Sequence, residues 1–160
     1  MSTSETHVWS LDTGSELHTL KIPISGIYTS GAVSTTSNGK YVLIGNNDGS
    51  ISEWDLKTGE LQRTPQMHEK NKQTGIALIE MIYITPDGKH ICSIDNNHII
   101  KIWGYSSGQV RRTQGLKVWT LIITPDGKKL IQAQTDTSIV ITDLLTRKNI
   151  NLKNRFFWQT

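Results

Sequence analysis

The chain has 160 residues, with 17 basic and 14 acidic side chains, a net charge of +3 and a single cysteine. One cysteine excludes an internal disulfide and any zinc site built from several cysteines. No apolar run reaches the ~18 residues that cross a bilayer, and the N-terminus lacks a secretory signal. The charge is also far below that of a nucleic-acid-binding surface. We therefore expect one cytoplasmic domain that binds neither nucleic acid nor membranes.

Short apolar runs alternate along the chain with clusters of Gly, Asn, Asp and Ser. No stretch has apolar residues at the spacing of an amphipathic helix, and the abundant Thr and Ile side chains favour strands. Near-regular spacing of short strands and turns is typical of antiparallel sheets. The fold class that the sequence predicts is therefore all-β.

Three copies of a repeat follow one another in the sequence, and each has corresponding residues at the same spacings. Each copy has an anchor, which is Trp54, Trp103 or Thr142. Fifteen residues before each anchor lies the glycine of an NGK or DGK turn, and three residues before it lies an isoleucine. A partial fourth copy surrounds Trp9. Repeats of about 40 residues are typical of propellers and solenoids.

Each copy divides into four strands. In the copy around Trp54, the second strand is 41–45, the third is 50–56 and the fourth is 60–64, with turns between them. The inner strands 76–85 and 118–124 are almost continuously apolar, which predicts burial on both faces. Four antiparallel strands per unit predict a partial β-propeller. It comprises a partial blade at 1–20, blades at 21–64, 65–113 and 114–152, and the possible start of a further blade at 153–160.

The segments ISEWDLKTGE, IKIWGYSSGQ and VWSLDTGSE, together with PDGK before two of the third strands, resemble the WD-repeat family of β-propellers. Members of that family are generally non-catalytic scaffolds that gather other proteins. The resemblance therefore implies a protein–protein interaction scaffold whose partners are other proteins, with no enzyme activity.

The sequence departs from this family in two ways. The Gly-His pair that usually opens a repeat is missing, because Gly26, Gly75 and Gly115 have no histidine after them. The aspartate that stands six residues before the anchor is replaced by Asn97 in the middle copy. We therefore do not expect the hydrogen-bond network that His, Asp and Trp build in the family.

The number of blades is too small for a closed ring, which usually has four to eight. The chain could be a fragment of a longer propeller, a propeller completed by a partner, or one that self-associates through its open blade edges. Another alternative is a segment of a propeller enzyme or multidomain signalling protein whose catalytic part lies outside this chain.

Asp12, Thr13 and Gly14 form the triplet found at the active site of aspartic proteases. Those enzymes need two such carboxylates that share a proton. In the repeat frame the triplet aligns with the turn at 57–59, so we expect a strand-joining turn without catalytic activity.

The remaining reactive side chains do not form a recognisable catalytic or metal site. Cys92 falls in a second strand, where a small buried residue is expected. No glycine-rich loop opens a helix, and we predict no cofactor and no metal. The histidines lack metal-ligand spacing, and we expect surface or strand-edge positions for all of them: His7, His18, His68, His90 and His98.

The second unit is ten residues longer than the third, and we assign the extra residues to the segment 65–75. Long loops on one face of repeat proteins often bind partners. Met67, His68, Lys70 and Lys72 are therefore the predicted partner-binding residues. The alternative is a solvated spacer that binds nothing.

The C-terminal segment 153–160 mixes Lys153 and Arg155 with Phe156, Phe157 and Trp158. Such a mixture can stack on single-stranded nucleic acid or insert at a membrane surface. In the repeat frame the segment falls where the next inner strand begins, and we favour that interpretation.

Overall fold

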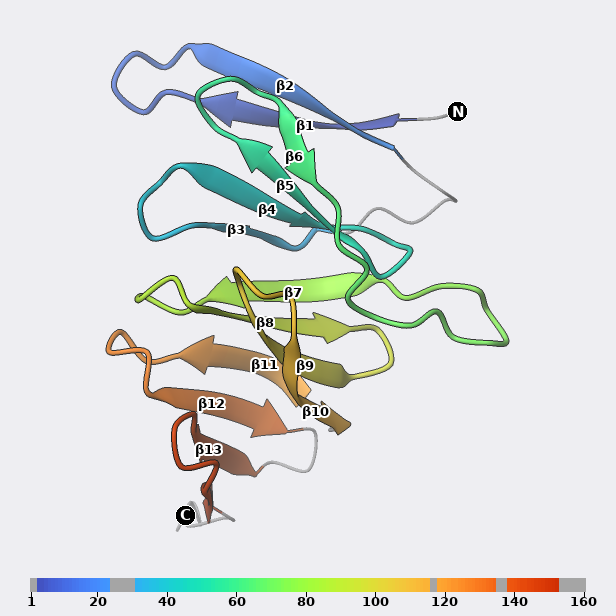
Figure 1. The fold of residues 1–160 in the computed structure, drawn as a ribbon, viewed down its shortest axis with the longest axis vertical. Coiled ribbons are helices and arrows are strands. Elements are labelled where there is room, and N and C mark those ends of the chain that lie inside the picture. The colour runs from blue at the N-terminus through green and yellow to red at the C-terminus, as the bar shows by residue number, and fades with distance from the viewer. Residues whose placement is uncertain (1–2, 24–30, 116–117, 135–137, 153–160) are drawn as a thin grey trace, which may run out of the picture.

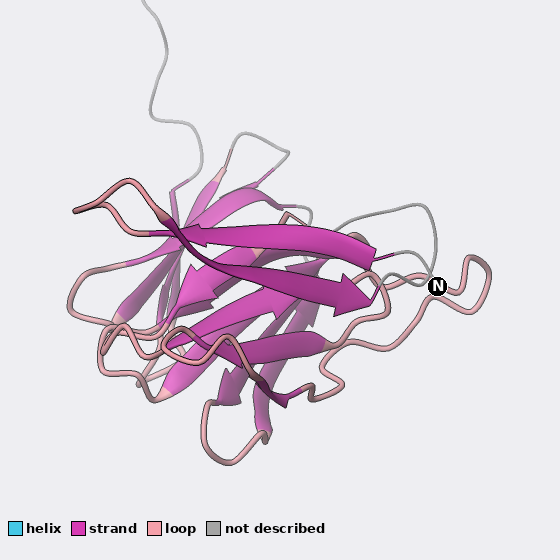
Figure 2. Cartoon of the chain, turned by 90° about the horizontal axis from the view of Figure 1, so that it is seen from above, coloured by secondary structure: helices cyan, strands magenta, loops and turns pink. Residues whose placement is uncertain are grey.

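The structure is a computed structural model that describes residues 3–23, 31–115, 118–134 and 138–152. These residues form strands and loops without a helix (Figure 2). They therefore contain no helix long and apolar enough to cross a membrane. The strands form four antiparallel sheets that follow one another along the long axis of the molecule in chain order (Figure 1).

Each sheet consists of strands that are consecutive in the sequence. Sheet 1 pairs β1 (Thr3–Trp9) with β2 (Glu16–Pro23). Sheet 2 contains β3 (Val33–Thr35), β4 (Tyr41–Gly45), β5 (Ile51–Asp55) and β6 (Leu61–Arg63). Sheet 3 contains β7 (Ile79–Ile84), β8 (His90–Asp95), β9 (Ile99–Gly104) and β10 (Val110–Gly115). Sheet 4 contains β11 (Val118–Ile123), β12 (Lys129–Gln134), β13 (Ile139–Asp143) and β14 (Asn149–Leu152).

This architecture confirms the predicted fold class, an all-β partial propeller of four-stranded antiparallel blades. Two boundaries differ from the prediction, because β2 extends to Pro23 and β10 extends to Gly115. The predicted start of a further blade at 153–160, with its basic and aromatic side chains, lies outside the described residues.

The turns between the first and second strands of sheets 2 to 4 share one hydrogen-bond pattern. A threonine hydroxyl donates to the side-chain oxygen of the Asn or Asp two residues later, and that oxygen accepts the amide N–H of the following lysine. The hydroxyl distances are 2.7, 2.5 and 2.5 Å in Thr36–Asn38, Thr85–Asp87 and Thr124–Asp126. The glycines of the three turns have φ of 66°, 67° and 68°, a region that glycine tolerates. The NGK and DGK sequences therefore make the same turn, as predicted.

The Asp-Thr-Gly triplet also lies in a turn, between β1 and β2. The amide of Gly14 donates to the carbonyl oxygen of Ser10 at 2.9 Å, and Gly14 has φ of 66°. All three residues are exposed. The prediction of a strand-joining turn is confirmed.

Apolar side chains fill the three spaces between successive sheets. Neighbouring residues of one strand point to opposite faces, so Ile91 packs toward sheet 2 and Cys92 toward sheet 4. Cys92 is buried as predicted, and burial raises the pKa of its thiol to about 12. The cluster between sheets 1 and 2 contains Leu20, Ile22, Val42, Ile44 and Trp54. The cluster between sheets 2 and 3 includes Leu43, Ile51, Met67, Ile79, Ile91 and Trp103. The cluster between sheets 3 and 4 includes Cys92, Ile94, Ile100, Ile102, Leu121 and Leu130.

The most buried strands are β5 and β8, and not the inner strands that the sequence analysis favoured. All five residues of β5 are buried, whereas Glu80 in β7 and Ile122 in β11 are exposed. Burial of a strand's faces depends on the sheets that pack on them. β7 packs on both faces, with Ile82 in the cluster shared with sheet 2 and Tyr83 in the cluster shared with sheet 4. β11 packs Leu121 against sheet 3, but no described strand covers Ile122 on its other face. The prediction of packing on both faces is therefore confirmed for β7 and wrong for β11.

A polar cluster also joins sheets 2 and 3. Glu53 is buried on β5, and its carboxylate accepts hydrogen bonds from Arg63 Nε at 2.6 Å and from the Tyr105 hydroxyl at 2.7 Å. The Arg63 guanidinium lies over the Tyr105 ring, 4.9 Å from its centre, and donates to the Tyr105 carbonyl oxygen at 3.1 Å. Each charged group therefore has a partner from the neighbouring sheet.

Replacement of Tyr105 by phenylalanine should lower the free energy of unfolding by about 1–2 kcal/mol, because Glu53 then loses a hydrogen-bond donor. Burial, reinforced by the Glu53 hydrogen bond, raises the pKa of Tyr105 to about 12. The unfolded value is about 10, so the stability contributed by Tyr105 is complete below pH 10 and is lost as the pH rises through 12. Urea unfolding at pH 7 and absorbance titration check both points. Equal stability of the variant and the wild-type protein would contradict this assignment. So would a tyrosine titration near pH 12 that the Tyr105→Phe variant still shows.

Candidate functional site

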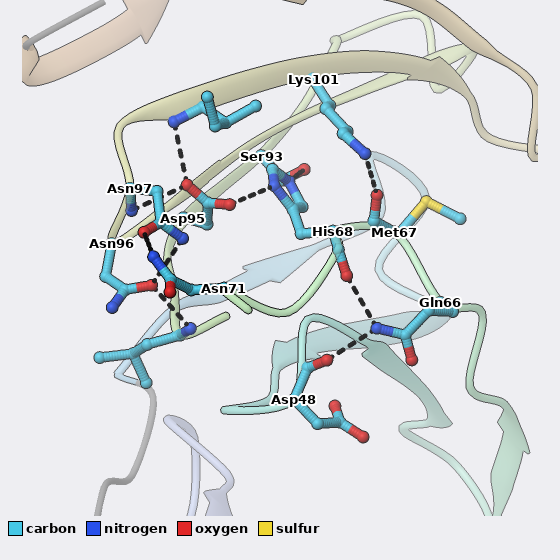
Figure 3. Close-up of polar contacts among 12 residues, drawn as sticks. Asp48, Gln66, Met67, His68, Asn71, Ser93, Asp95, Asn96, Asn97 and Lys101 are labelled. Atoms are coloured by element: carbon cyan, nitrogen blue, oxygen red, sulfur yellow. Dashed lines mark hydrogen bonds and ion pairs between the residues drawn. The ribbon is translucent and has the colours of Figure 1, made fainter. Parts of the chain in front are cut away.

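The segment 64–78, which links β6 to β7, is held against the turn between β4 and β5 (Figures 1 and 3). The Gly49 carbonyl oxygen accepts the amide N–H groups of Met67 at 3.0 Å and His68 at 2.9 Å. The Gln66 side-chain amide donates to the carbonyl oxygens of Asp48 at 2.7 Å and His68 at 2.9 Å. The segment 65–75, which the sequence analysis identified as a long loop between blades, is thus attached to sheet 2 by backbone hydrogen bonds.

A buried hydrogen-bond chain connects this loop to sheet 3 (Figure 3). His68 Nδ1 lies 3.1 Å from Asp95 Oδ2, and His68 Nε2 lies 2.8 Å from Ser93 Oγ. The Trp103 indole N–H donates to the same Ser93 oxygen at 3.3 Å. One arrangement of protons satisfies every group: Nδ1–H donates to the carboxylate, and the Ser93 hydroxyl donates to Nε2. We call these four residues, His68, Ser93, Asp95 and Trp103, the buried network.

Asp95 also closes the turn between β8 and β9. Its Oδ1 accepts the amide N–H groups of Asn97 at 3.0 Å and Ile99 at 2.9 Å. Burial by itself raises the pKa of Asp95, but the hydrogen bond from His68 and those from the two amides outweigh it and hold the pKa below its usual value. Asp95 is therefore a charged acceptor that fixes both the loop and the turn.

Two predictions are corrected by this network. We expected the His, Asp and Trp hydrogen bonds of the WD-repeat family to be missing. This was wrong for sheet 3, which we call the middle blade, where His68, Asp95 and Trp103 take part in such hydrogen bonds. The expectation of a surface or strand-edge position for His68 was also wrong, because this residue is 1% exposed. The pattern was missed because Met67, and not glycine, precedes the histidine, and because the aspartate stands eight residues before Trp103.

The other described blades lack the residues that would build the same network. The positions of Ser93 and Asp95 correspond to Ile44 and Asn46 in sheet 2. The indole nitrogen of Trp54 is accordingly buried without a hydrogen-bond partner. In sheet 4 the position of Ser93 is taken by Gln132, whose buried side-chain amide also has no partner. Within the described part of the chain, the middle blade is thus the one whose preceding loop is held in place by buried polar side chains.

The four predicted partner-binding residues separate into two pairs. Met67 and His68 are 8% and 1% exposed, so their side chains lie in the interior. They therefore cannot form the contact surface that the sequence analysis predicted for them. Lys70 and Lys72 are exposed, and neither makes an ion pair within the described residues. That these two lysines contact a partner stays a prediction.

Lys70 and Lys72 line an open groove of about 700 Å³ between the loop and sheet 3. Asn71 also lines the groove, and its side-chain amide donates to Asn97 Oδ1 at 3.1 Å. Lys101 lines it as well and donates from Nζ to the Met67 carbonyl oxygen at 2.9 Å. The lining residues are Glu69, Lys70, Asn71, Lys72, Gln73, Asp95, Asn97, Ile99 and Lys101.

The groove is lined mostly by charged and polar side chains. Both ring nitrogens of His68 are engaged by Asp95 and Ser93, so the imidazole is not available to activate a nucleophile. No group of three or more His, Cys, Asp or Glu side chains that could hold a metal occurs in the described residues. The groove offers a ligand lysine ammonium groups, side-chain amides and the exposed Glu69 carboxylate, while Asp95 is buried at its lining.

Comparison with known proteins gives a short match. No protein-family model matches the chain. Over 34 residues the chain is 50% identical to eukaryotic translation initiation factor 3 subunit I of Botryotinia fuckeliana. The match to the same subunit of Sclerotinia sclerotiorum has the same length and identity. It covers 21% of this chain and 10% of each relative, so most of either protein lies outside the matched segment.

Proposed function

We propose that this chain is a non-catalytic interaction scaffold of the WD-repeat type that binds other proteins. Three observations support the proposal: consecutive four-stranded blades, the buried network of the middle blade, and the short match to a protein named as a subunit of a larger factor. The proposal includes a cytoplasmic location and protein partners, with no role for nucleic acid, membranes or a cofactor.

The groove beside the loop is the proposed binding site. The observation that carries this choice is the position of Lys70 and Lys72. Both are exposed on a loop that the buried network holds in place through His68. A fixed loop loses little conformational entropy when a ligand binds, which favours affinity. The two ammonium groups at its surface, which make no ion pair with any described residue, favour a negatively charged segment of the partner protein.

Charge reversal tests this site. The probe is a fluorescein-labelled glutamate-rich decapeptide, and binding is measured by fluorescence anisotropy at low and physiological salt. The double variant Lys70→Glu and Lys72→Glu should weaken binding about ten-fold or more, because two attractive contacts become repulsive. The matched control is Lys57→Glu with Lys148→Glu, two exposed lysines in other turns with the same change in net charge.

Equal weakening in both double variants would show that the peptide responds to net charge alone, and the groove would then be rejected as the site. No binding of the peptide to the wild-type chain would reject an acidic ligand. Circular dichroism of each variant ensures that a loss of binding is not a loss of folding.

A further inference from the structure

Three of the four prolines of the chain directly follow a threonine, at Thr64-Pro65, Thr85-Pro86 and Thr124-Pro125. Proline-directed protein kinases phosphorylate a threonine or serine that a proline follows. They also need an accessible hydroxyl and an extended backbone around it. The three steps carry the same sequence signal, so the structure decides which of them such a kinase can use.

Thr85 and Thr124 belong to the DGK turns, where their hydroxyls are already engaged. The Thr85 hydroxyl donates to Asp87 Oδ1 at 2.5 Å and accepts the amide N–H of His90 at 3.0 Å, and Thr85 is 2% exposed. The Thr124 hydroxyl likewise donates to Asp126 Oδ1 at 2.5 Å. A phosphoryl group on either oxygen would break the turn and would lie beside a carboxylate that repels it.

Thr64 lies in different surroundings. Its side chain is exposed and makes no hydrogen bond to any other described residue. It directly follows β6, which is the outermost strand of sheet 2 and is hydrogen-bonded to β5 on one side only. Leu61 and Gln62, which precede it, are exposed as well. The hydroxyl of Thr64 is therefore accessible, and the residues before it already have the extended backbone in which kinases bind their substrates.

We propose that Thr64 is a phosphorylation site for a proline-directed protein kinase. In this step the Thr64 Oγ attacks the γ-phosphorus of MgATP, and the bond from that phosphorus to the oxygen bridging the β- and γ-phosphates breaks. ADP leaves with the bridging oxygen, and the hydroxyl proton passes to the catalytic base of the kinase. The site is separate from the groove beside Lys70 and Lys72, so either proposal can fail without the other.

The residue before Thr64 gives the modification a structural consequence. The Arg63 guanidinium joins sheets 2 and 3 by donating to Glu53 Oε2 at 2.6 Å and to the Tyr105 carbonyl oxygen at 3.1 Å. The Arg63 side chain is 39% exposed, so it is also reachable from solvent. A phosphothreonine carries a charge of about −1.5 to −2 and binds guanidinium through two parallel hydrogen bonds. Phosphorylation of Thr64 should therefore draw Arg63 away from Glu53 and weaken the junction between the two sheets.

Kinase assays on the folded chain test the site. The full chain is incubated with MgATP and a purified mitogen-activated protein kinase, and tandem mass spectrometry identifies the modified residue. Thr64 should be phosphorylated, and Thr64→Ala should abolish the incorporation. Pro65→Ala should lower the rate about ten-fold or more, because the kinase discriminates its substrates by this proline. Thr124→Ala is the matched control and should leave the rate unchanged.

Synthetic peptides separate the effect of the fold from that of the sequence. Three peptides, one around each threonine–proline step, should all be phosphorylated, because the turns are absent from them. In the folded chain, with each rate divided by that of its peptide, Thr64 should react about ten-fold or more faster than Thr124. Equal normalised rates at the two sites would overturn the proposal. A Thr64 that reacts in neither the folded chain nor the peptide, or in the peptide alone, would overturn it as well.

Urea unfolding of the phosphorylated chain tests the consequence for sheets 2 and 3. The midpoint should be lower than that of the unmodified chain. In Arg63→Gln the midpoint should already be lowered, and phosphorylation should not lower it further, because the guanidinium that the phosphate attracts is missing. Thr64→Ala treated with kinase and MgATP is the control. A midpoint that phosphorylation leaves unchanged, or lowers equally in Arg63→Gln, would reject the role of Arg63.

Discussion

Replacement of His68 by alanine should lower the free energy of unfolding by about 3 kcal/mol. His68 is enclosed between the loop and sheet 3, and its removal leaves a cavity beside Ser93 and Asp95. The Asp95 carboxylate keeps its two amide donors but loses the imidazole on its other oxygen. A buried carboxylate that loses a partner cannot recover the lost interaction from water.

Urea unfolding followed by tryptophan fluorescence measures this loss. The matched control is Lys72→Ala in the same loop, which removes an exposed side chain and should change stability by less than about 0.5 kcal/mol. Ser93→Ala should have an intermediate cost of about 1–2 kcal/mol, because the hydroxyl serves both His68 and Trp103. If His68→Ala were as stable as the control, the buried network would not be a major source of the stability of the middle blade.

Replacement of Gly49 by alanine should be comparably damaging, at about 2–5 kcal/mol, and for a different reason. A Cβ atom on Gly49 would lie 2.3 Å from the His68 carbonyl oxygen, and the φ of Gly49 is +87°. The obstructing atom belongs to the backbone, so no side-chain rotation relieves the contact. The loop must move away from the turn between β4 and β5, and the Gly49 hydrogen bonds to Met67 and His68 are then lost.

Gly39 supplies the control for this variant. Its φ is also positive, at +66°, but a Cβ atom there would meet nothing within 4 Å. Gly39→Ala should therefore cost only the conformational strain, about 1–2 kcal/mol. The difference between the two alanine variants in the same urea experiment isolates the contact with the loop. Equal losses would indicate that the loop is not held at Gly49.

The repeat and the turns could be predicted because they depend on nearby residues. In Thr85-Pro86-Asp87-Gly88-Lys89 every hydrogen bond of the turn forms within five residues, and the glycine supplies the required φ. The same local chemistry explains why Asp12, Thr13 and Gly14 were correctly predicted as a turn. Periodic local patterns of this kind also carried the prediction of four-stranded blades.

The buried network could not be predicted from the family spacing. His68 and Asp95 are 27 residues apart with β7 between them, and the loop that carries His68 differs in length from the corresponding loops of the other units. The same cause misplaced Met67 and His68 on a binding surface. A loop that is long in the sequence was expected to be exposed, but backbone hydrogen bonds to Gly49 draw its first part into the space between sheets 2 and 3.

The alternation of side chains along β8 has a consequence for how such a protein can diverge. Ile91 and Cys92 are adjacent in the sequence but belong to different interblade clusters. A substitution at one position alters one junction and leaves the next junction chemically intact. Each junction can thus accumulate compensating changes on its own, so that the blades become individually recognisable while the stack as a whole is preserved.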